Sequence, residues 1–282
     1  MGRRRGVDAG GQNKSGAFFF FTATLLVWAA SLLFEIGFNR RTELSPIIAG
    51  FCLYQSANWF IRTCFNRDPL VVNTSVSLLH SSLTSVSVIS VFANQWMRSS
   101  LSTMFGHSEL VDHSWPWAYS ALCISCGYFA YDQLDMLLYH LYSGWIPSIL
   151  VHHLVLLICF TMALYRNVTI NYLILTLVCE LHSVFLHVRK LRRMAGVRGT
   201  SRSTLVKLEW CGNWTTYVLA RFASHVLITM KLLKDAHKFN KGLELPLALL
   251  GMAGMNLLNV FLGVDLFKAY SREKNEHRDH HK

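Results

Sequence analysis

The sequence predicts an all-α membrane protein whose helices cross the bilayer several times and pack into a bundle. Hydrophobic residues make up 52% of the chain and charged residues only 15%, which is more apolar and less charged than a soluble domain. The apolar residues also gather in segments of about 20 residues, the length that spans a bilayer as a helix. At 282 residues, the chain has room for seven or eight such spans and no separate soluble domain.

The first predicted span covers residues 17–34 and follows a basic N-terminus with Arg3, Arg4, Arg5 and Lys14. A basic start before an apolar run is also typical of a signal peptide. The apolar run of a cleaved signal is shorter, about 7 to 15 residues. We therefore expect this segment to be retained as a membrane helix.

Further apolar segments predict the remaining helices, although one of them is ambiguous. The segment 46–64 contains Gln55, Asn58 and Trp59 and is amphipathic, so it could lie in the interface rather than cross the membrane. The number of spans therefore stays open between seven and eight. The predicted segments after the first are 46–64, 72–93, 117–139, 147–164, 170–188, 212–232 and 246–267.

The distribution of basic residues predicts the orientation. The stretch 189–207 carries seven Lys or Arg and no acid, so the positive-inside rule places it in the cytosol. With eight spans, the basic N-terminus and the charged tail 271–282 are also cytosolic, and the loop 94–116 lies outside. Residues 1–67 then form a basic N-terminus with one or two membrane helices.

Polar residues inside the predicted spans are the best pointers to function, because a charge near the bilayer centre costs about 2.5 to 3.5 kcal/mol. Tyr128, Asp132, Asp135 and Tyr139 follow one another at spacings of four, three and four residues. These spacings place two acids and two phenols on one stripe of a helix. We expect that stripe to face protein or water.

The next predicted span begins with the pair His152 and His153. Adjacent helical residues point about 100° apart, so at most one of the two shares the face of Asp132 and Asp135. A short loop joins the two helices, which makes an Asp to His contact reasonable. The contact could hold a histidine as a general base or satisfy polar groups inside the bundle, and the sequence leaves both open.

Three further polar residues, Glu180, Arg221 and His80, lie in other predicted spans. Glu180 and Arg221 could pair across the bundle, and losing one partner of a buried pair costs roughly 3 to 5 kcal/mol, which favours a structural role. His80 lies in a span rich in small and hydroxylated residues, where close helix packing is the first interpretation.

Several classes of function are not supported. Glycine loops for phosphate, a G-x-S-x-G elbow and H-E-x-x-H are missing. Cys123-x-x-Cys126 lacks the second ligand pair of a zinc site, so we expect neither a metal nor a cofactor. The basic residues lie between apolar segments rather than along one face, so nucleic acid is not an expected partner. The sequons at Asn13, Asn73, Asn167 and Asn213 do not fall in suitable exterior loops.

The order of these motifs resembles a known family. The span with His80, the segment GYFAYDQLDM, the VHH pair, the segment LVCELHSVFLHVRK and the span around Arg221 together resemble the TLC domain, the Lag-type fold of lipid-sensing and lipid-synthesis proteins. The likeness covers residues 68–270. It implies a six-helix TLC bundle preceded by one or two N-terminal helices.

Two branches of that family imply different functions. Ceramide synthases join an acyl-CoA to a sphingoid base and use a His pair, here His152 and His153. Their H-D-x-S-D motif has only one acid here, Glu180, within CELHSVFLH. The GYF-x-x-D-x-x-D and LVHH segments are closer to the small TLC-domain proteins that regulate membrane fluidity, which implies a regulator that limits polyunsaturated, fluidising phospholipids. Whether such a protein is an enzyme stays open.

We therefore predict an apolar cavity that takes an acyl chain or a lipid headgroup. The expected partners are membrane phospholipids or acyl chains and a lipid-remodelling enzyme. The resemblance favours the plasma membrane, with the endoplasmic reticulum as the alternative. The candidate catalytic residues are His152, His153, Asp132 and Asp135, and the candidate lipid-binding residues are His80, Tyr128, Glu180 and Arg221.

Overall fold

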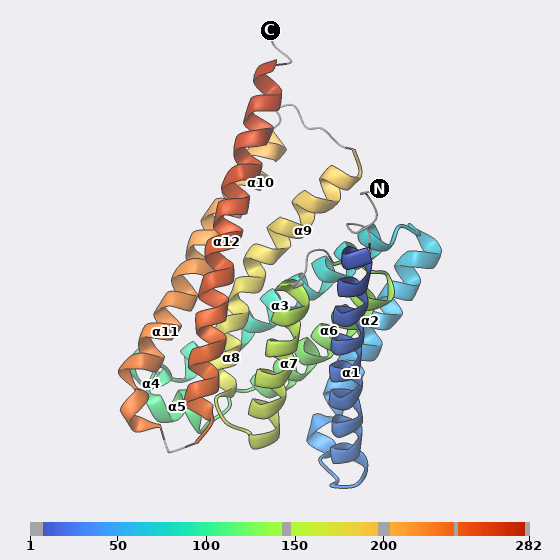
Figure 1. Cartoon of the computed structure of the whole chain (residues 1–282). Helices are drawn as coiled ribbons and strands as arrows, with labels where there is room; N and C mark the ends of the chain where they lie inside the picture. The colour runs from blue at the N-terminus through green and yellow to red at the C-terminus, as the bar shows by residue number, and fades with distance from the viewer. Residues whose placement is uncertain (1–7, 143–147, 197–203, 240–241, 280–282) are drawn as a thin grey trace. The chain divides into compact units, whose positions relative to one another are not determined.

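A computed structural model describes residues 8–142, 148–196, 204–239 and 242–279 of the chain (Figure 1). All regular elements in these ranges are helical, which confirms the predicted all-α class. The helices are α1 (Asp8–Gly37), η1 (Thr42–Leu44), α2 (Ser45–Cys64), α3 (Pro69–Arg98), α4 (Leu101–Met104), α5 (His107–Val111), α6 (Ala118–Leu138), α7 (Ser148–Arg166), α8 (Ile170–Thr176), η2 (Leu177–Cys179), α9 (Glu180–Met194), α10 (Thr204–Thr216), η3 (Tyr217–Ala223), α11 (Ser224–Lys234), η4 (Ala236–Lys238) and α12 (Glu244–Asp279).

Five helices in the described ranges are long and apolar enough to cross a membrane, and each overlaps a predicted span. This confirms a multi-pass membrane protein. The five are Gly16–Gly37, Pro69–Arg98, Ser148–Arg166, Ile170–Met194 and Glu244–Lys274.

The other three predicted spans are also helical but are not among these five. The segment 46–64 forms α2, and the segment 117–139 forms α6, whose Asp132 and Asp135 reduce its hydropathy. The segment 212–232 is divided among α10, η3 and α11. The count of seven or eight spans therefore stays a prediction.

The predicted exterior loop 94–116 is largely helical. Helix α3 extends to Arg98, and the short helices α4 and α5 follow it. Fully buried Asn171 in α8 fixes this segment, because its amide nitrogen donates to the carbonyl oxygens of Glu109 at 2.6 Å and His113 at 3.1 Å. Its amide oxygen accepts from the backbone nitrogen of Trp115 at 2.9 Å.

The chain divides into two compact units, each built from two distant stretches of sequence. Unit 1 comprises Met1–Asn73 and Cys123–Tyr165, and unit 2 comprises Thr74–Leu122 and Arg166–Lys282. Unit 1 therefore holds α1, α2, most of α6 and all of α7 except Arg166. Unit 2 holds most of α3 and all elements from α8 onward.

Two glycines allow α2 and α6 to cross closely in unit 1. A Cβ on Gly50 would lie 2.7 Å from the carbonyl oxygen of Ile124, and one on Gly127 would overlap the backbone of Ile47 and Phe51. Such contact between helix backbones requires residues without side chains. The crossing also brings residues later in both helices together.

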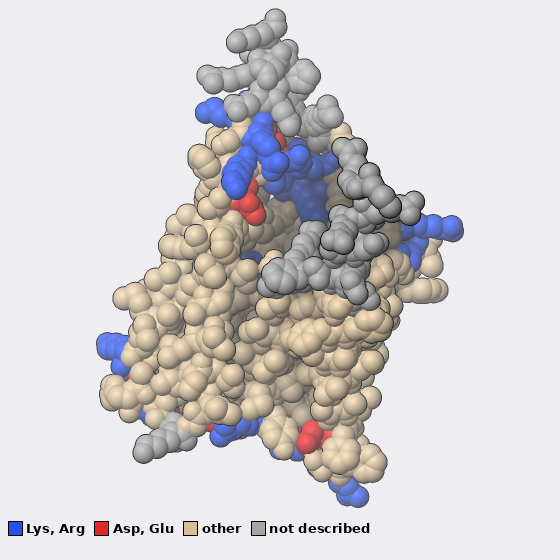
Figure 2. All heavy atoms as spheres, viewed as in Figure 1, with Lys and Arg blue, Asp and Glu red and all other residues tan. Residues whose placement is uncertain are grey.

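In unit 2, α10 and α12 share an apolar core that partly buried side chains of α9 and η3 complete. Val206 and Trp210 of α10 pack with Leu266 and Ala269 of α12. In Figure 2 the Lys and Arg side chains gather where α9, α10 and α12 converge, and the surface over α11 and the middle of α12 is mostly uncharged. This distribution is typical of helices that enter a bilayer below a charged end.

Candidate functional site

A buried polar cluster forms around the two acids of α6 in unit 1. Asp132 and Asp135 are each only 5% exposed. Asn73, at the start of α3, donates through its amide nitrogen to Asp132 Oδ1 at 2.7 Å and to Asp135 Oδ2 at 3.0 Å. One asparagine therefore holds both carboxyl groups on the same side of α6.

A second asparagine binds the cluster from α2. The Asn58 amide nitrogen donates to Asp135 Oδ1 at 3.0 Å and to the Tyr131 hydroxyl at 2.7 Å. Asn58 follows Gly50 by eight residues, and Asp135 follows Gly127 by eight residues. The glycine crossing therefore sets the contact between Asn58 and Asp135, two turns further along both helices.

His153 completes the cluster from α7. Its Nε2 atom lies 3.5 Å from Asp132 Oδ2, and its ring lies 5.7 Å from that of Phe129 between ring centres. His153 is buried, whereas the neighbouring His152 is half-buried. As predicted, the structure brings one histidine of the pair to the acids.

The open end of the cluster carries a cation. Arg62 Nη2 lies 3.8 Å from Asp135 Oδ1, and the guanidinium carbon lies 4.1 Å from the centre of the Tyr139 ring. Tyr128 is buried within the predicted stripe, whereas Tyr139 at the helix end is 41% exposed. The stripe therefore faces protein over Tyr128, Asp132 and Asp135 and becomes exposed at Tyr139.

Sequence reasoning did not assign Asn58, Asn73, Arg62 and Tyr131 to this cluster. Asn58 and Arg62 lie four residues apart in α2, and Arg62 Nε donates to Asn58 Oδ1 at 3.3 Å, so their spacing could have signalled one polar face. Asn73 was considered only as a sequon. At 6% exposure it is too buried to carry a glycan, which agrees with its rejection as a glycosylation site.

The other candidate residues lie in unit 2. His80 is 1% exposed, and its Nδ1 atom lies 3.3 Å from the Thr84 hydroxyl. The side chain of Glu180 accepts a hydrogen bond from the Ser81 hydroxyl at 2.7 Å. Both contacts fit the predicted packing of a helix rich in hydroxyl groups.

The predicted pair between Glu180 and Arg221 is wrong. In the part of the chain that the structure describes, no ion pair joins them. Glu180 holds Ser81, and Arg221 instead donates to neutral groups of η2 and α9. Arg221 lies in the π-helix η3, which was not predicted from the sequence.

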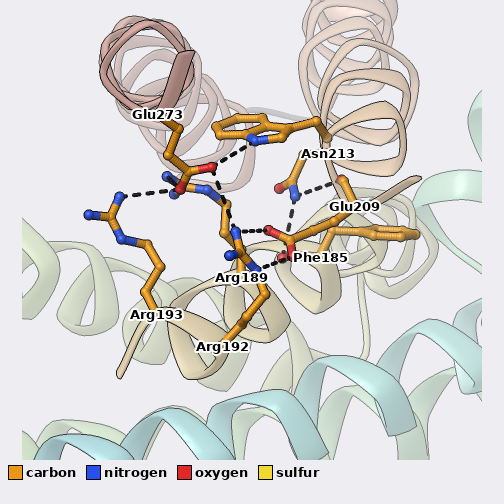
Figure 3. Close-up of polar contacts among 8 residues, drawn as sticks. Phe185, Arg189, Arg192, Arg193, Glu209, Asn213 and Glu273 are labelled. Carbon is orange, nitrogen blue, oxygen red and sulfur yellow. Dashed lines mark hydrogen bonds and ion pairs between the residues drawn. The ribbon is translucent and has the colours of Figure 1, made fainter. Parts of the chain in front are cut away.

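The predicted basic loop begins inside α9, where ion pairs fasten three helices together (Figure 3). Glu273 of α12 accepts from Arg189 Nη2 at 2.9 Å, from Arg193 Nη1 at 3.4 Å and from Trp210 Nε1 at 2.9 Å. Glu209 of α10 accepts from Arg192 Nε at 2.7 Å. The cluster is a structural clamp between α9, α10 and α12.

The candidate residues thus form two groups. Asp132, Asp135 and His153 meet in unit 1, whereas His80, Glu180 and Arg221 belong to unit 2. A single cavity lined by both groups stays a prediction. Within the described residues, no group of three or more His, Cys, Asp or Glu side chains could hold a metal ion.

Comparisons with known proteins give one consistent likeness. The family model of the TLC domain matches residues 70–268. TLC domain-containing protein 2 of Danio rerio is 28% identical over 217 residues, which cover 67% of this chain and 84% of that protein. Its namesake in Homo sapiens is 27% identical over 218 residues, covering 75% and 76% of the two chains, and that of Mus musculus is 29% identical over 184 residues, covering 65% and 54%. No solved structure matches the chain.

Proposed function

Because this chain belongs to the TLC domain family, we propose that it regulates the acyl composition of membrane phospholipids and limits the incorporation of polyunsaturated, fluidising chains. The GYF-x-x-D-x-x-D and LVHH segments support the proposal through their resemblance to the fluidity-regulating branch. In this proposal the protein acts on or senses lipids at the plasma membrane, and a lipid-remodelling enzyme is its partner.

The observation that carries the proposal is the buried cluster of Asp132, Asp135 and His153. Ionisable side chains at membrane depth are expensive and usually mark a functional site. Here two acids and an imidazole lie within one small region, and Asn58 and Asn73 supply fixed donors. Such a cluster could bind the polar part of a lipid while the surrounding helices contact its acyl chain.

The proposal is tested by profiling phospholipid acyl chains in cells that lack the protein. The cells are restored with the wild type, with the double variant His152→Ala/His153→Ala, or with His113→Ala as an exposed control at matched expression. We expect wild type and control to restore the fraction of polyunsaturated phospholipids, and the double variant to leave it raised. If loss of the protein leaves this fraction unchanged, the proposal is wrong.

A second candidate function is acyl transfer of the ceramide synthase type, and the 3.5 Å distance between Asp132 and His153 favours it. A lipid amine would attack the carbonyl carbon of an acyl-CoA thioester and the C–S bond would break. His153 would take the proton of the amine and return it to the leaving thiolate, as a general base does. The purified protein would then convert acyl-CoA and a sphingoid base to an amide and free thiol. Absence of the amide would refute acyl transfer, and the regulatory function would be the remaining candidate.

A further inference from the structure

Arg221 occupies an unusual position for a cation. Helices α10, η3 and α11 continue without a break from Thr204 to Lys234, and Arg221 lies 17 residues after the first and 13 before the last. At a rise of about 1.5 Å per residue, the Arg221 backbone is therefore about 20 Å or more from either end. Arg221 lies in the predicted span 212–232, and a charged residue in the middle of a membrane helix normally has a partner of its own.

The π-helix η3 (Tyr217–Ala223) fixes the backbone around Arg221. The carbonyl oxygen of Arg221 lies 2.7 Å from Nδ1 of His225, which is fully buried. A carbonyl can only accept, so His225 Nδ1 carries a proton and donates. Short π-helical segments within longer helices are frequent at functional sites.

Among the described residues, the guanidinium of Arg221 donates hydrogen bonds only to neutral groups, all from η2 and α9. Its Nε donates to His182 Nδ1 at 3.0 Å, and its Nη2 donates to the Ser183 hydroxyl at 2.7 Å and to the Cys179 carbonyl at 3.4 Å. In the described part of the chain, the N–H groups of Nη1 have no acceptor. Because the side chain is only half-buried, Nη1 is the part of the fork left for a ligand.

No described carboxylate lies within ion-pair distance of Arg221, in contrast to other shielded arginines. Arg189 and Arg192 lie 2.9 and 2.7 Å from a carboxylate oxygen, and Arg62 lies 3.8 Å from one. Glu180 adjoins Cys179, whose carbonyl accepts from Arg221, yet its carboxylate holds Ser81 instead. A counter-charge for Arg221 could therefore be supplied by a molecule outside the described chain.

We propose that Arg221 binds the anionic group of a lipid, which is either the carboxylate of a fatty acid or the phosphate of a phospholipid. The guanidinium fork fits both oxyanions, and within the predicted span 212–232 the available anions are carried by lipids. His182 acts as a positioning residue: it accepts from Nε and so directs Nη1 toward the ligand. The inference rests on the proposed function, because it names the lipid chemistry that the bundle recognises.

The test measures binding of two single-chain lipids to the purified full-length protein in detergent. Oleate supplies a carboxylate, lysophosphatidate supplies a phosphate, and methyl oleate supplies the same chain without charge. Wild type, Arg221→Gln and Arg221→Lys are compared with Arg272→Gln, which changes an exposed arginine of α12. We expect Arg221→Gln to weaken binding of the anionic lipid by about tenfold or more, the range for loss of a charge-assisted hydrogen bond, and Arg221→Lys to retain part of it.

The outcomes separate the two sources of the anion and decide the proposal. Tighter binding of oleate assigns a fatty acid, and tighter binding of lysophosphatidate assigns a phospholipid. Equal binding of both lipids by Arg221→Gln and wild type would overturn the proposal. If Arg221→Gln does not fold, the affinities of the wild type for the three lipids decide the proposal. Equal binding of methyl oleate and the two anionic lipids by the wild type would also overturn the proposal. The binding assay and the cellular lipid profile are independent. If the wild type binds the anionic lipid but loss of the protein leaves cellular lipids unchanged, the proposed function is refuted and this binding site is not.

Discussion

Asp132 Oδ2 lies 3.5 Å from His153 Nε2, and both side chains are almost fully buried. A carboxylate beside one imidazole nitrogen favours a proton on that nitrogen and leaves the basic lone pair on the other. Asp132 would thus orient His153 with Nδ1 as the basic atom. His152 is half-buried, whereas His153 is buried, so the two adjacent histidines differ in environment.

This difference predicts unequal effects of single substitutions. His153→Gln should abolish restoration of the phospholipid acyl profile, because it removes the imidazole held by Asp132. His152→Gln should keep most of it. Asp132→Asn should resemble His153→Gln. The measurement is acyl-chain profiling of restored cells at equal protein level. Full restoration by His153→Gln would assign this histidine to packing alone.

Asn73→Leu should destabilise the protein, because both acids would lose the donor they share. Leaving a buried polar group without its hydrogen bond costs about 1 to 3 kcal/mol, and here two carboxyl groups are affected. We expect a clear fall in the apparent melting temperature of the detergent-purified protein. Asn39→Leu is the control, because Asn39 is exposed and donates to Glu35 on the protein surface, and it should have little effect. An equal fall in both variants would contradict the role of Asn73.

The sequence predicted the elements better than the contacts between them. Helical spacing alone placed Asp132 and Asp135 on one face of α6, and the short connection to the next helix indicated a contact with one histidine of the pair, without deciding between His152 and His153. Asn73 could not be assigned in this way, because its contact depends on how residues 69–73 lie beside α6. A single sequence contains no information on which helices are neighbours when distant stretches pack together.

The partners of Arg221 also could not be predicted from the sequence. Its burial was expected, but an acid in another span seemed the natural partner. Arg221 lies in the π-helix η3, and Ser183, His182 and the Cys179 carbonyl accept from its Nε and Nη2 atoms. Neutral acceptors are common in every helix, so residue type alone could not identify them.

Gly127→Ala should be strongly destabilising, although alanine is the better helix former. A Cβ on Gly127 would overlap the backbone of α2 at Ile47 and Phe51, and backbone cannot move aside as a flexible side chain can. Gly254→Ala is the matched control, because its Cβ would meet nothing within 4 Å. That change should be neutral or stabilising by up to about 1 kcal/mol. Thermal unfolding of both variants in detergent checks the prediction, which a stable Gly127→Ala would refute.

Stability should fall in acid through Asp235, which lies after α11 and outside the predicted span. Burial tends to raise its pKa, but hydrogen bonds from Lys231 and Lys238 hold the pKa below the usual value. His107 also faces this carboxylate, at 3.7 Å. A lowered folded pKa means that the stabilisation is complete above the unfolded value, about 3.9, and is lost as the pH falls through the folded value.

Asp235→Asn tests this assignment. The variant should be less stable than wild type at pH 7, and the difference should shrink as the pH falls below about 4, because the wild-type carboxyl then becomes neutral too. Apparent melting temperatures between pH 7 and pH 3 give the measurement. A constant difference across that range would show that the charge of Asp235 does not contribute.

The clamp in Figure 3 predicts that one acid stabilises the end of α12. Glu273→Ala would leave Arg189, whose side chain is 12% exposed, without its ion pair and Trp210 without an acceptor. Loss of one partner of a buried pair costs about 3 to 5 kcal/mol. Because the pair is not fully buried, we expect Glu273→Ala to lower the free energy of unfolding by roughly 2 kcal/mol. The loss should be seen as a lower melting temperature and as faster proteolysis of α12. Glu43→Ala removes an exposed pair with Arg41, which is worth about 0 to 1 kcal/mol. Similar melting temperatures for the two variants would mean that the charges near α9 do not hold α12.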